Sequence, residues 1–271
     1  MERPLAVVLT AIEKSLARPT IGIIIDQGEI APGVGTGVLI RIGDRQFIAT
    51  VSHNLDNLDK LSFLSSALLK KDATKMPIVR SGRNKRLDVG YIEVPPDREF
   101  AGRTAIGLDR IATAGTLLHE GCYLFGYPVE LRTLDREPKV VGHDPALMFT
   151  MPLKGDDLPE VPWDSRRANE MEDLFMRYDR RETCFDIAPQ CRENLPHPGG
   201  MSGGGVWLAF KPEGAIWSAE DMKLVAIQSH WLKDCYARST LIGHWLELIH
   251  DDYPDLSATI VEHIRGTAAS A

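Results

Sequence analysis

Short apolar runs rich in Val, Ile, Phe and Tyr occupy much of the chain between residues 20 and 231, and Gly, Pro or Asp separates them. Such short, punctuated runs indicate antiparallel strands that build a sandwich or a barrel. Because no alternation of helical and strand patterns recurs, a parallel α/β sheet is disfavoured. The expected strands are 20–26, 35–42, 46–52, 87–94, 122–127, 139–143, 146–151, 205–210 and 223–231.

Helical patterns occupy the two ends of the chain. Residues 1–17 predict an amphipathic helix, and the charges of Glu13 and Lys14 within the apolar pattern argue against a signal peptide. In the tail, apolar side chains recur at helical spacing on both sides of Pro254. Since proline interrupts a helix, the tail predicts two helices that pack one face against the body.

Two further local patterns lie inside the strand-rich region. The residues Gly43-Asp44 separate two apolar runs and predict a tight hairpin turn. The segment 153–182 is highly charged and predicts a long surface insertion with a helix over 165–179. Two interpretations of this insertion remain open, a lid over a cleft or a plain surface excursion.

The composition is that of an ordinary soluble globular protein. The chain has 271 residues, of which 44% are hydrophobic and 25% charged, and its formal net charge is −7. This acidic balance argues against nucleic acid as a partner, because no surplus of cations is present to neutralise phosphates. No apolar run approaches the roughly 20 residues that a membrane-spanning helix needs. We therefore expect neither nucleic acid nor a membrane as a partner.

The four cysteines form no C-x-x-C pair and have no histidine cluster beside them; they stand at positions 122, 184, 191 and 235. A zinc site is therefore disfavoured, and so is a disulfide framework in a chain of this length without an export signal. We expect reduced, mostly buried thiols and an intracellular, cytoplasmic protein. No pattern in the sequence calls for a metal or a cofactor.

The segment HPGGMSGGGVW, residues 197–207, places five glycines around one serine, Ser202, directly before an apolar run. Acyl transfer by a serine requires an exposed hydroxyl, a base, a group that orients the base, and backbone donors for the developing negative charge. A glycine-rich turn can expose the hydroxyl and turn bare N–H groups toward a substrate. The plainer interpretation of this segment is a turn without chemistry.

Candidates for the base and for its orienting group stand at the ends of expected strands. A strand, a hairpin turn and a second strand deliver His53 to the rim of a sheet, and Asp88 opens the apolar run that follows it. Taken singly, a histidine is more often structural, and an aspartate before a strand is usually a turn residue. Two other acids, Asp56 and Asp59, follow the histidine too closely to face it across a barrel.

Together these pieces resemble the trypsin-like serine proteases of the chymotrypsin fold. The stretch GTGVLI…ATVSHN is similar to that family's G-[ST]-G-[FV]-L…T-A-x-H, LDVGYI to its D-[IV]-A-L strand, and GGMSGGGVW to its G-[DN]-S-G-G-P. The order His53, Asp88, Ser202 is also the family's order, and the resemblance covers residues 20–235. It implies an all-β fold of two antiparallel six-stranded β-barrels, with an N-terminal helix and C-terminal helices.

The resemblance implies a division of the chain into four parts. These are an N-terminal helical extension (1–19), a first β-barrel that carries His53 and Asp88 (20–118), a second β-barrel that carries Ser202 and the charged insertion (119–237), and C-terminal helices (238–271).

The resemblance also implies a role for each site residue. His53 is the general base and then the general acid, Asp88 accepts a hydrogen bond from its imidazole, Ser202 forms the acyl-enzyme, and the N–H groups of Gly200 and Ser202 form the oxyanion hole. Substrate contacts are implied for Gly199, Ser229, His230 and Trp231, and Ser229 is also expected near Asp88. The implied substrate is a protein or peptide. Because an intracellular protease must spare its host, we expect narrow specificity or a regulatory protein partner.

Three residues depart from the family's pattern. Met201 replaces the acidic or amide residue before the serine, so activation through a new N-terminal amine is not expected. Asn54 stands where secreted members carry a disulfide cysteine, which agrees with an intracellular protein. Trp231 stands where the family has a glycine beside the substrate, which narrows the cleft and argues against a preference for Lys or Arg. These departures keep a second hypothesis open, a non-catalytic module that uses the same fold to bind a peptide or partner.

Overall fold

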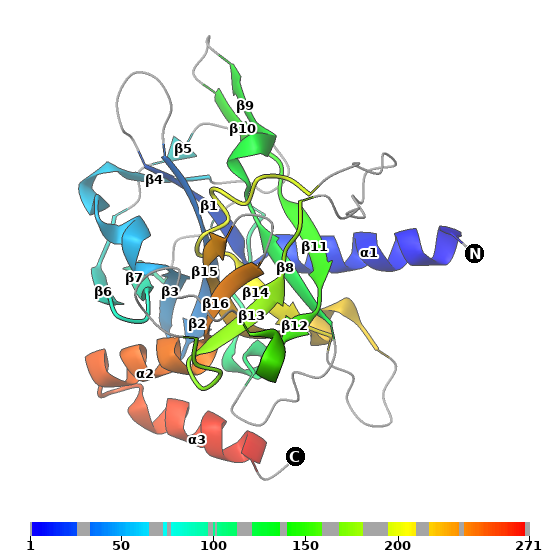
Figure 1. The fold of residues 1–271 in the computed structure, drawn as a ribbon. Coiled ribbons are helices and arrows are strands. Elements are labelled where there is room, and N and C mark those ends of the chain that lie inside the picture. The colour runs from blue at the N-terminus through cyan, green and yellow to red at the C-terminus, as the bar shows by residue number, and fades with distance from the viewer. Residues whose placement is uncertain are drawn as a thin grey trace.

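The computed structural model describes residues 2–25, 33–64, 73–74, 77–96, 100, 102–112, 121–135, 140–158, 168–180, 195–209, 217–232 and 236–268. Strands dominate these residues and form two curled antiparallel sheets, with helices at the periphery (Figure 1). The sequence-based prediction of an all-β fold with two antiparallel sheets and terminal helices is therefore confirmed.

Within the described residues, the first sheet contains seven strands in the order β5-β4-β1-β2-β3-β7-β6. Their bounds are β1 (Thr20–Ile25), β2 (Gly33–Ile42), β3 (Arg45–Thr50), β4 (Leu61–Leu64), β5 (Ala73–Thr74), β6 (Arg80–Asn84) and β7 (Val89–Val94). Strands β2 and β3 form the predicted hairpin, in which Ile42 pairs with Arg45 and Gly43 takes a φ of +59° in the turn. This rigid hairpin leads directly into the short helix η1 (Ser52–Leu55), which carries His53.

In the described part of the chain, the second sheet also has seven strands, in the order β11-β8-β14-β15-β16-β13-β12. Their bounds are β8 (Cys122–Gly126), β11 (Ala146–Thr150), β12 (Pro152–Leu153), β13 (Asp173–Arg177), β14 (Gly205–Leu208), β15 (Lys223–Leu232) and β16 (Tyr236–Leu241). A separate two-stranded hairpin is formed by β9 (Arg132–Asp135) and β10 (Val140–His143). Among the described residues each sheet has one strand more than the six expected, because the two-residue edge strands β5 and β12 are included.

The α-helices of the described ranges lie outside the sheets: α1 (Glu2–Ala17), α2 (Ile242–Asp252) and α3 (Ser257–Ala268). The first half of α1 projects from the body (Figure 1), whereas Ser15 near its end is buried and donates a hydrogen bond to the carbonyl of Ala219. Helices α2 and α3 are separated at Tyr253 and Pro254, as predicted. Five short 3₁₀ helices besides η1 connect strands: η2 (Leu58–Lys60), η3 (Leu108–Arg110), η4 (Val129–Leu131), η5 (Gly155–Asp157) and η6 (Ala219–Asp221).

Helix α2 is fixed to the first sheet by buried aromatic and charged side chains. Tyr253 donates a hydrogen bond to the buried carboxylate of Glu93 at 2.9 Å, and Arg45 pairs with the same carboxylate at 2.8 Å. The guanidinium groups of Arg45 and Arg80 both lie over the Tyr253 ring, 5.1 and 4.8 Å from its centre. Burial raises the pKa of Tyr253 to about 12, so this hydroxyl stays a donor at neutral pH.

The core explains why the strand-forming runs are apolar on both faces. On β3, the side chain of Ile48 packs inside the first sheet, while its neighbours Phe47 and Ala49 belong to the cluster that joins the two sheets and the helices. A strand covered on both sides has no solvent face, so its sequence reads as a continuous apolar run. Trp207 and Trp245 are fully buried in the joining cluster.

The charged segment 153–182 differs from its prediction. Residues 173–177 form β13, a strand that pairs with both β12 and β16, and Leu174, Phe175 and Met176 are buried. The expected helix over 165–179 is therefore wrong, because the short apolar run LFM packs in the second sheet and overrides the helix-friendly charges around it. Residues 159–167 and 181–182 of the segment lie outside the described residues, as do the expected boundary at 118–119 and Cys184, Cys191 and Cys235.

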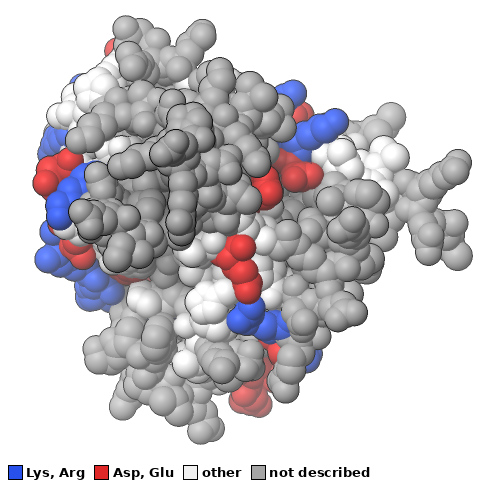
Figure 2. Space-filling view, turned by 90° about the horizontal axis from the view of Figure 1, so that it is seen from above, with Lys and Arg blue, Asp and Glu red and all other residues white. Residues whose placement is uncertain are grey.

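Basic and acidic side chains of the described residues lie side by side on the face seen from above (Figure 2). None of the helices in the described ranges has both the length and the apolar character that crossing a membrane requires. Within the same ranges, no three His, Cys, Asp or Glu side chains are grouped so that they could hold a metal ion. Cys122 is buried in the second sheet, and this burial raises the pKa of its thiol to about 12.

Candidate active site

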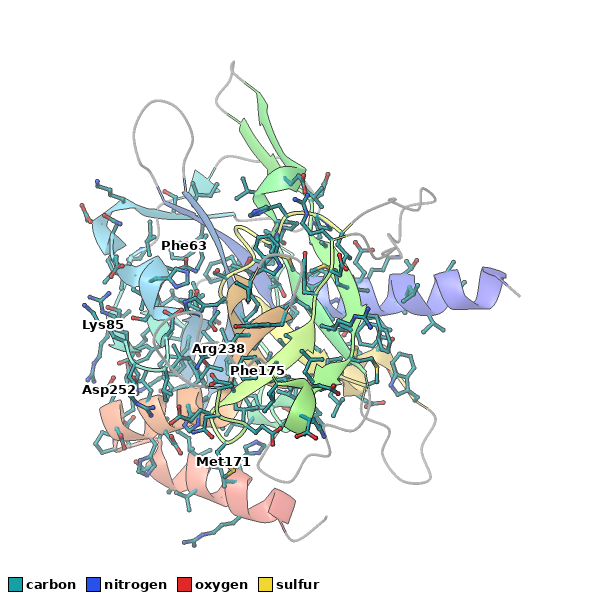
Figure 3. The ribbon with its side chains drawn as sticks, in the orientation of Figure 1. Phe63, Lys85, Met171, Phe175, Arg238 and Asp252 are labelled. Atoms are coloured by element: carbon teal, nitrogen blue, oxygen red, sulfur yellow. The ribbon has the colours of Figure 1, made fainter. Side chains whose placement is uncertain are left out.

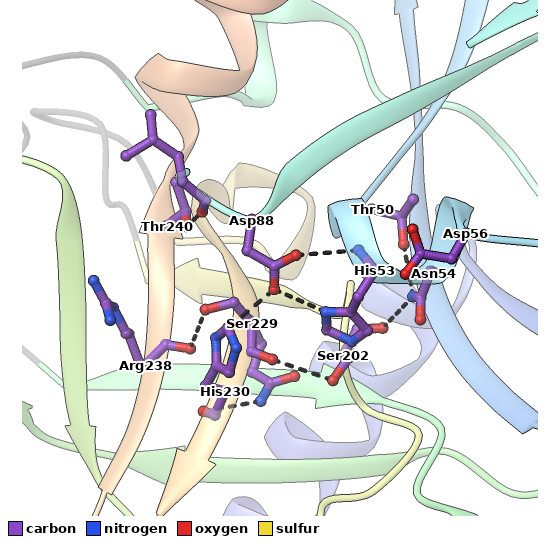
Figure 4. Close-up of polar contacts among 12 residues, drawn as sticks. Thr50, His53, Asn54, Asp56, Asp88, Ser202, Ser229, His230, Arg238 and Thr240 are labelled. Carbon is purple, nitrogen blue, oxygen red and sulfur yellow. Dashed lines mark hydrogen bonds and ion pairs between the residues drawn. The ribbon is translucent and has the colours of Figure 1, made fainter. Parts of the chain in front are cut away.

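His53 and Asp88 meet at the end of the first sheet (Figure 4). His53 lies in η1 directly after β3, and Asp88 directly precedes β7, the strand that pairs with β3. The Nδ1 atom of His53 lies 2.8 Å from Oδ2 of Asp88, and the backbone N–H of His53 donates to Oδ1 at 3.1 Å. The carboxylate therefore holds both the ring and the backbone of the same histidine. The imidazole is 44% exposed and the carboxylate only 14%, which leaves the ring accessible from solvent.

The backbone of Asp88 adopts an unusual conformation. Its φ of 51° is the one positive φ of a non-glycine residue among those the structure describes. Aspartate and asparagine tolerate this left-handed region better than other residues with a β-carbon, but it still carries a cost. Such strain tends to occur where surrounding structure and function require it. Here it turns the carboxylate back toward η1.

Ser202 lies in the tight loop that precedes β14, and the loop is anchored by its neighbours. Met201, which replaces the acidic or amide residue of the family's pattern, is fully buried in the core of the second sheet, so apolar packing holds the loop at this position. The carbonyl of Ser202 accepts the N–H of Thr36 on β2 at 2.8 Å, which ties the serine loop to the first sheet. The hydroxyl of Ser202 donates to the carbonyl of Ser229 at 3.2 Å, and none of the hydrogen bonds among the described residues joins it to His53.

Two backbone N–H groups at and just before Ser202 have no hydrogen-bond partner among the residues that the structure describes. The carbonyl of Gly199 accepts the N–H of Val129 at 2.6 Å, so the N–H of Gly200, on the opposite side of that trans peptide, points away from Val129. Neither Gly200 nor Ser202 donates its N–H to another described residue. Gly200 has a φ of +92°, and a β-carbon there would lie 2.7 Å from the carbonyl oxygen of Tyr127. Only glycine fits this position, because any side chain would collide with backbone.

Asn54 connects the histidine segment to the serine loop, and the sequence did not predict this role. Its buried side-chain amide donates to the carbonyl of Ser202 at 2.9 Å and to the hydroxyl of Thr50 at 3.0 Å. The amide lies against the bare Cα of Gly35, where an added β-carbon would be 2.5 Å from its nitrogen. Thr36 on the same strand donates its hydroxyl to the carbonyl of Gly200 at 2.8 Å. A polar network therefore sets the loop relative to η1.

The β15 residues with predicted substrate contacts lie beside this cluster. Ser229, expected near Asp88, donates its hydroxyl to the carbonyl of Arg238 at 3.1 Å. The next residue, His230, also faces Asp88, with its Nδ1 atom 3.7 Å from Oδ2. Trp231 packs its indole edge-on against the imidazole of His197, with ring centres 4.8 Å apart. Gly199 donates its N–H to Nδ1 of His197 at 3.0 Å.

Sequence comparisons gave no relative: no family model and no curated protein matches the chain. Comparison with solved structures did. The serine endoprotease from Yersinia pestis matches with a TM-score of 0.52 at 10% identity, over 89% of this chain and 65% of that one. An inactivated protease paralogue from the scabies mite matches with a TM-score of 0.55 at 11% identity, over 89% and 96%.

An HtrA-type protease with a tripeptide matches with a TM-score of 0.51 at 12% identity, over 89% of this chain and 62% of that one. The chain thus spans slightly less than two thirds of the length of two of these three proteins. At 10–12% identity the likeness concerns the fold, and it agrees with the two curled antiparallel sheets described above. The chain has the fold of the chymotrypsin-like, or trypsin-like, serine proteases.

Proposed function

We propose that the protein is a serine endopeptidase that cleaves protein or peptide substrates through an acyl-enzyme. The observation that carries this proposal is the pairing of His53 with Asp88 at 2.8 Å beside a serine loop in which the N–H groups of Gly200 and Ser202 have no partner among the described residues. In this proposal, Asp88 keeps the proton of the neutral imidazole on Nδ1, which leaves Nε2 free to accept a proton from Ser202. The fold is compatible with the proposal but does not by itself define an activity.

The proposed reaction begins with a rotation of the Ser202 side chain. Its hydroxyl leaves the carbonyl of Ser229 and turns toward Nε2 of His53, an exchange of one hydrogen bond for another. Hydrogen bonds of a catalytic site are often long or misdirected without substrate and form only in the complex. Side-chain rotamer changes of this kind are fast, on the picosecond to nanosecond scale. Because one hydrogen bond replaces another, the rotation costs little net free energy.

The chemical steps then follow in two halves. The Ser202 oxygen bonds to the scissile carbonyl carbon while its proton passes to His53, and the carbonyl oxygen becomes an oxyanion bound by the N–H groups of Gly200 and Ser202. His53 gives the proton to the leaving amine as the C–N bond breaks. Water then repeats the sequence on the acyl-enzyme and restores the serine. One backbone donor to an oxyanion is typically worth a factor of about 10²–10³ in rate.

The test is covalent labelling with a fluorophosphonate, which forms a bond to an activated serine without requiring a particular peptide. We expect one adduct on Ser202, and we expect Ser202→Ala to lose the adduct and to lower kcat for a cleaved peptide by about 10⁶. Ser81→Ala, on β6 outside the cluster, is the matched control and should label as the wild type does. A folded wild-type protein that stays unlabelled would contradict the proposal.

A non-catalytic peptide-binding module is the second candidate, and one observation favours it. The hydroxyl of Ser202 is bonded to a backbone carbonyl and not to the imidazole that would activate it. In such a module, Ser202→Ala would leave peptide affinity unchanged and no covalent adduct would form on the wild type. The labelling experiment therefore separates the two candidates in a single step.

We infer that Asn54 is a positioning residue, since it holds the serine loop and η1 in one arrangement. Asn54→Ala should slow fluorophosphonate labelling about 10–100-fold, because small displacements of reacting groups have effects of this size. It should also lower the free energy of unfolding by about 1–3 kcal/mol, because two buried hydrogen bonds are lost, each worth about 0.5–1.5 kcal/mol. Asn57→Ala, at an exposed position of the following turn, is the control. A labelling rate that falls no more than the folded fraction would refute the positioning role.

A further inference from the structure

The P1 residue of a substrate is the residue that supplies the scissile carbonyl. The geometry of the proposed site indicates where its side chain lies. The carbonyl carbon must reach Ser202 Oγ, while its oxygen reaches the N–H groups of Gly200 and Ser202. Strand β14 pairs with β15 as far as Ile227. The next β15 residue, Gln228, is hydrogen-bonded to the serine loop: its carbonyl accepts the N–H of Gly203, and its own N–H donates to the carbonyl of Gly204.

From His230 onward, β15 pairs among the described residues with β16 alone. Its other edge faces the site, where the carbonyl of Ser229 accepts the hydroxyl of Ser202. An extended peptide can add to such an edge through main-chain hydrogen bonds. Its P1 side chain then points into the space between residues 229–231 of β15 and residues 197–200 of the serine loop.

Two aromatic rings meet across this space. The indole of Trp231 comes from β15 and the imidazole of His197 comes from the segment before the serine loop, with an angle of 70° between the rings and 4.8 Å between their centres. At that distance their edges are in contact, and no room for a third side chain is left between them. The indole of Trp231 also packs against the ring of Tyr178, with ring centres 6.1 Å apart.

Both walls of the space are held in place by hydrogen bonds. Tyr178 is buried and donates its hydroxyl to the carbonyl of Pro196 at 2.7 Å. His197 accepts the N–H of Gly199 on its ring and donates its own backbone N–H to Glu130. Glu130 in turn binds Arg180 through both carboxylate oxygens at 3.1 Å. Displacing His197 to admit a large side chain would therefore break several contacts at once.

We propose that Trp231 closes the P1 pocket against His197 and restricts the substrate to peptides with a small P1 residue, Gly, Ala or Ser. This inference rests on the proposed endopeptidase function. It specifies the substrate class by volume: a methyl or hydroxymethyl group fits beside the indole, whereas a benzyl group or a lysine side chain must displace it. Pockets of this kind discriminate by roughly 10–200-fold for a single methylene, so a whole ring should be rejected more strongly.

The test uses peptidyl diphenyl phosphonates that differ only in the P1 side chain, Ala, Phe or Lys. The serine oxygen bonds to phosphorus, a phenoxide leaves, and the serine proton neutralises it, so the labelling rate reports the fit of P1 without a natural substrate. We expect the wild type to react with the Ala probe at least about 100-fold faster than with the Phe or Lys probe. Trp231→Ala should raise the Phe rate about 100-fold and change the Ala rate only a few-fold.

The controls separate this inference from the proposed function. Trp217→Ala removes another half-buried tryptophan, outside the site, and should keep the wild-type preference. Trp231→Leu keeps an apolar contact for His197, and its labelling rate with the Phe probe should lie between those of the wild type and Trp231→Ala. This variant serves as the test if Trp231→Ala does not fold. The inference is overturned if the wild type prefers the Phe or Lys probe, if the Ala probe fails although a fluorophosphonate labels Ser202, or if the preference survives Trp231→Ala. Failure of the fluorophosphonate itself overturns the function.

Discussion

Under the proposed mechanism, replacing Asp88 by asparagine is expected to lower kcat/KM for a cleaved peptide about 10⁴-fold while the protein stays folded, an effect of the size that the same change has in serine proteases of known Ser-His-Asp triad. The two carboxylate oxygens accept two different N–H groups of His53, from the backbone at 3.1 Å and from the ring at 2.8 Å. An asparagine has only one oxygen. If it accepts the backbone N–H, its NH₂ group faces Nδ1 of the ring.

The ring must then carry its proton on Nε2, and in that tautomer it cannot accept a proton from Ser202. The backbone of residue 88 does not change the result, because asparagine tolerates the φ of 51° as aspartate does. The loss should therefore appear in catalysis and not in folding. The measurements are kcat/KM, the rate of fluorophosphonate labelling, and the thermal unfolding curve of each variant.

Asp56→Asn provides the matched control for this prediction. Asp56 is close to His53 in sequence, its side chain is 57% exposed, and it pairs with Arg83 at 2.6 Å. This exposed pair should contribute little, so Asp56→Asn is expected to keep wild-type labelling and stability within a small factor. If the Asp56 variant lost activity and the Asp88 variant did not, the assignment of the orienting carboxylate would be wrong.

The strands that carry the candidate site were predictable because their apolar runs are long and clearly bounded. The β2–β3 hairpin delivers His53, and its two apolar runs flank an unambiguous Gly-Asp turn. Strands with few apolar residues were missed, such as β6, whose sequence is RSGRN, and β16, which begins with Tyr-Ala-Arg-Ser. Their polar residues find partners in other elements: Arg80 reaches Asp252 on α2, and Arg238 reaches Asp173 on β13. Periodicity within one segment cannot show such partners.

The candidate site was predictable to the extent that its residues follow a recognisable motif. His53, Asp88 and Ser202 were selected by their spacing and order, and the structure brings the first two into contact. Asn54 was noticed only as a missing cysteine, because its hydrogen bond to the carbonyl of Ser202 spans 148 positions in the chain. The approach of His230 to Asp88 was missed for the same reason. Contacts between distant segments depend on the packing of the two sheets.

The second prediction with a large effect concerns stability: Arg238→Met should lower the free energy of unfolding by about 3–5 kcal/mol. Arg238 on β16 pairs with Asp173 on β13 at 2.7 Å, and the two side chains are 2% and 0% exposed. The guanidinium also lies over the ring of Phe175, 5.6 Å from its centre (Figure 3). Removing the cation leaves a buried carboxylate without this counter-charge. For this reason, the loss of one partner lowers the free energy of unfolding by more than the intact pair contributes to it.

Urea unfolding of three variants distinguishes this explanation from a loss of packing alone. The double variant Arg238→Met/Asp173→Leu removes both charges, so it should recover most of the stability lost in the single variant. Arg18→Ala breaks an exposed pair with Glu220, whose side chains are 60% and 55% exposed, and should cost less than about 1 kcal/mol. If the double variant were less stable than Arg238→Met, the ion pair would contribute net stability. The buried carboxylate without its counter-charge would then not explain the stability lost in Arg238→Met. Since Ser229 donates to the carbonyl of Arg238, a destabilised β16 should also slow labelling of Ser202.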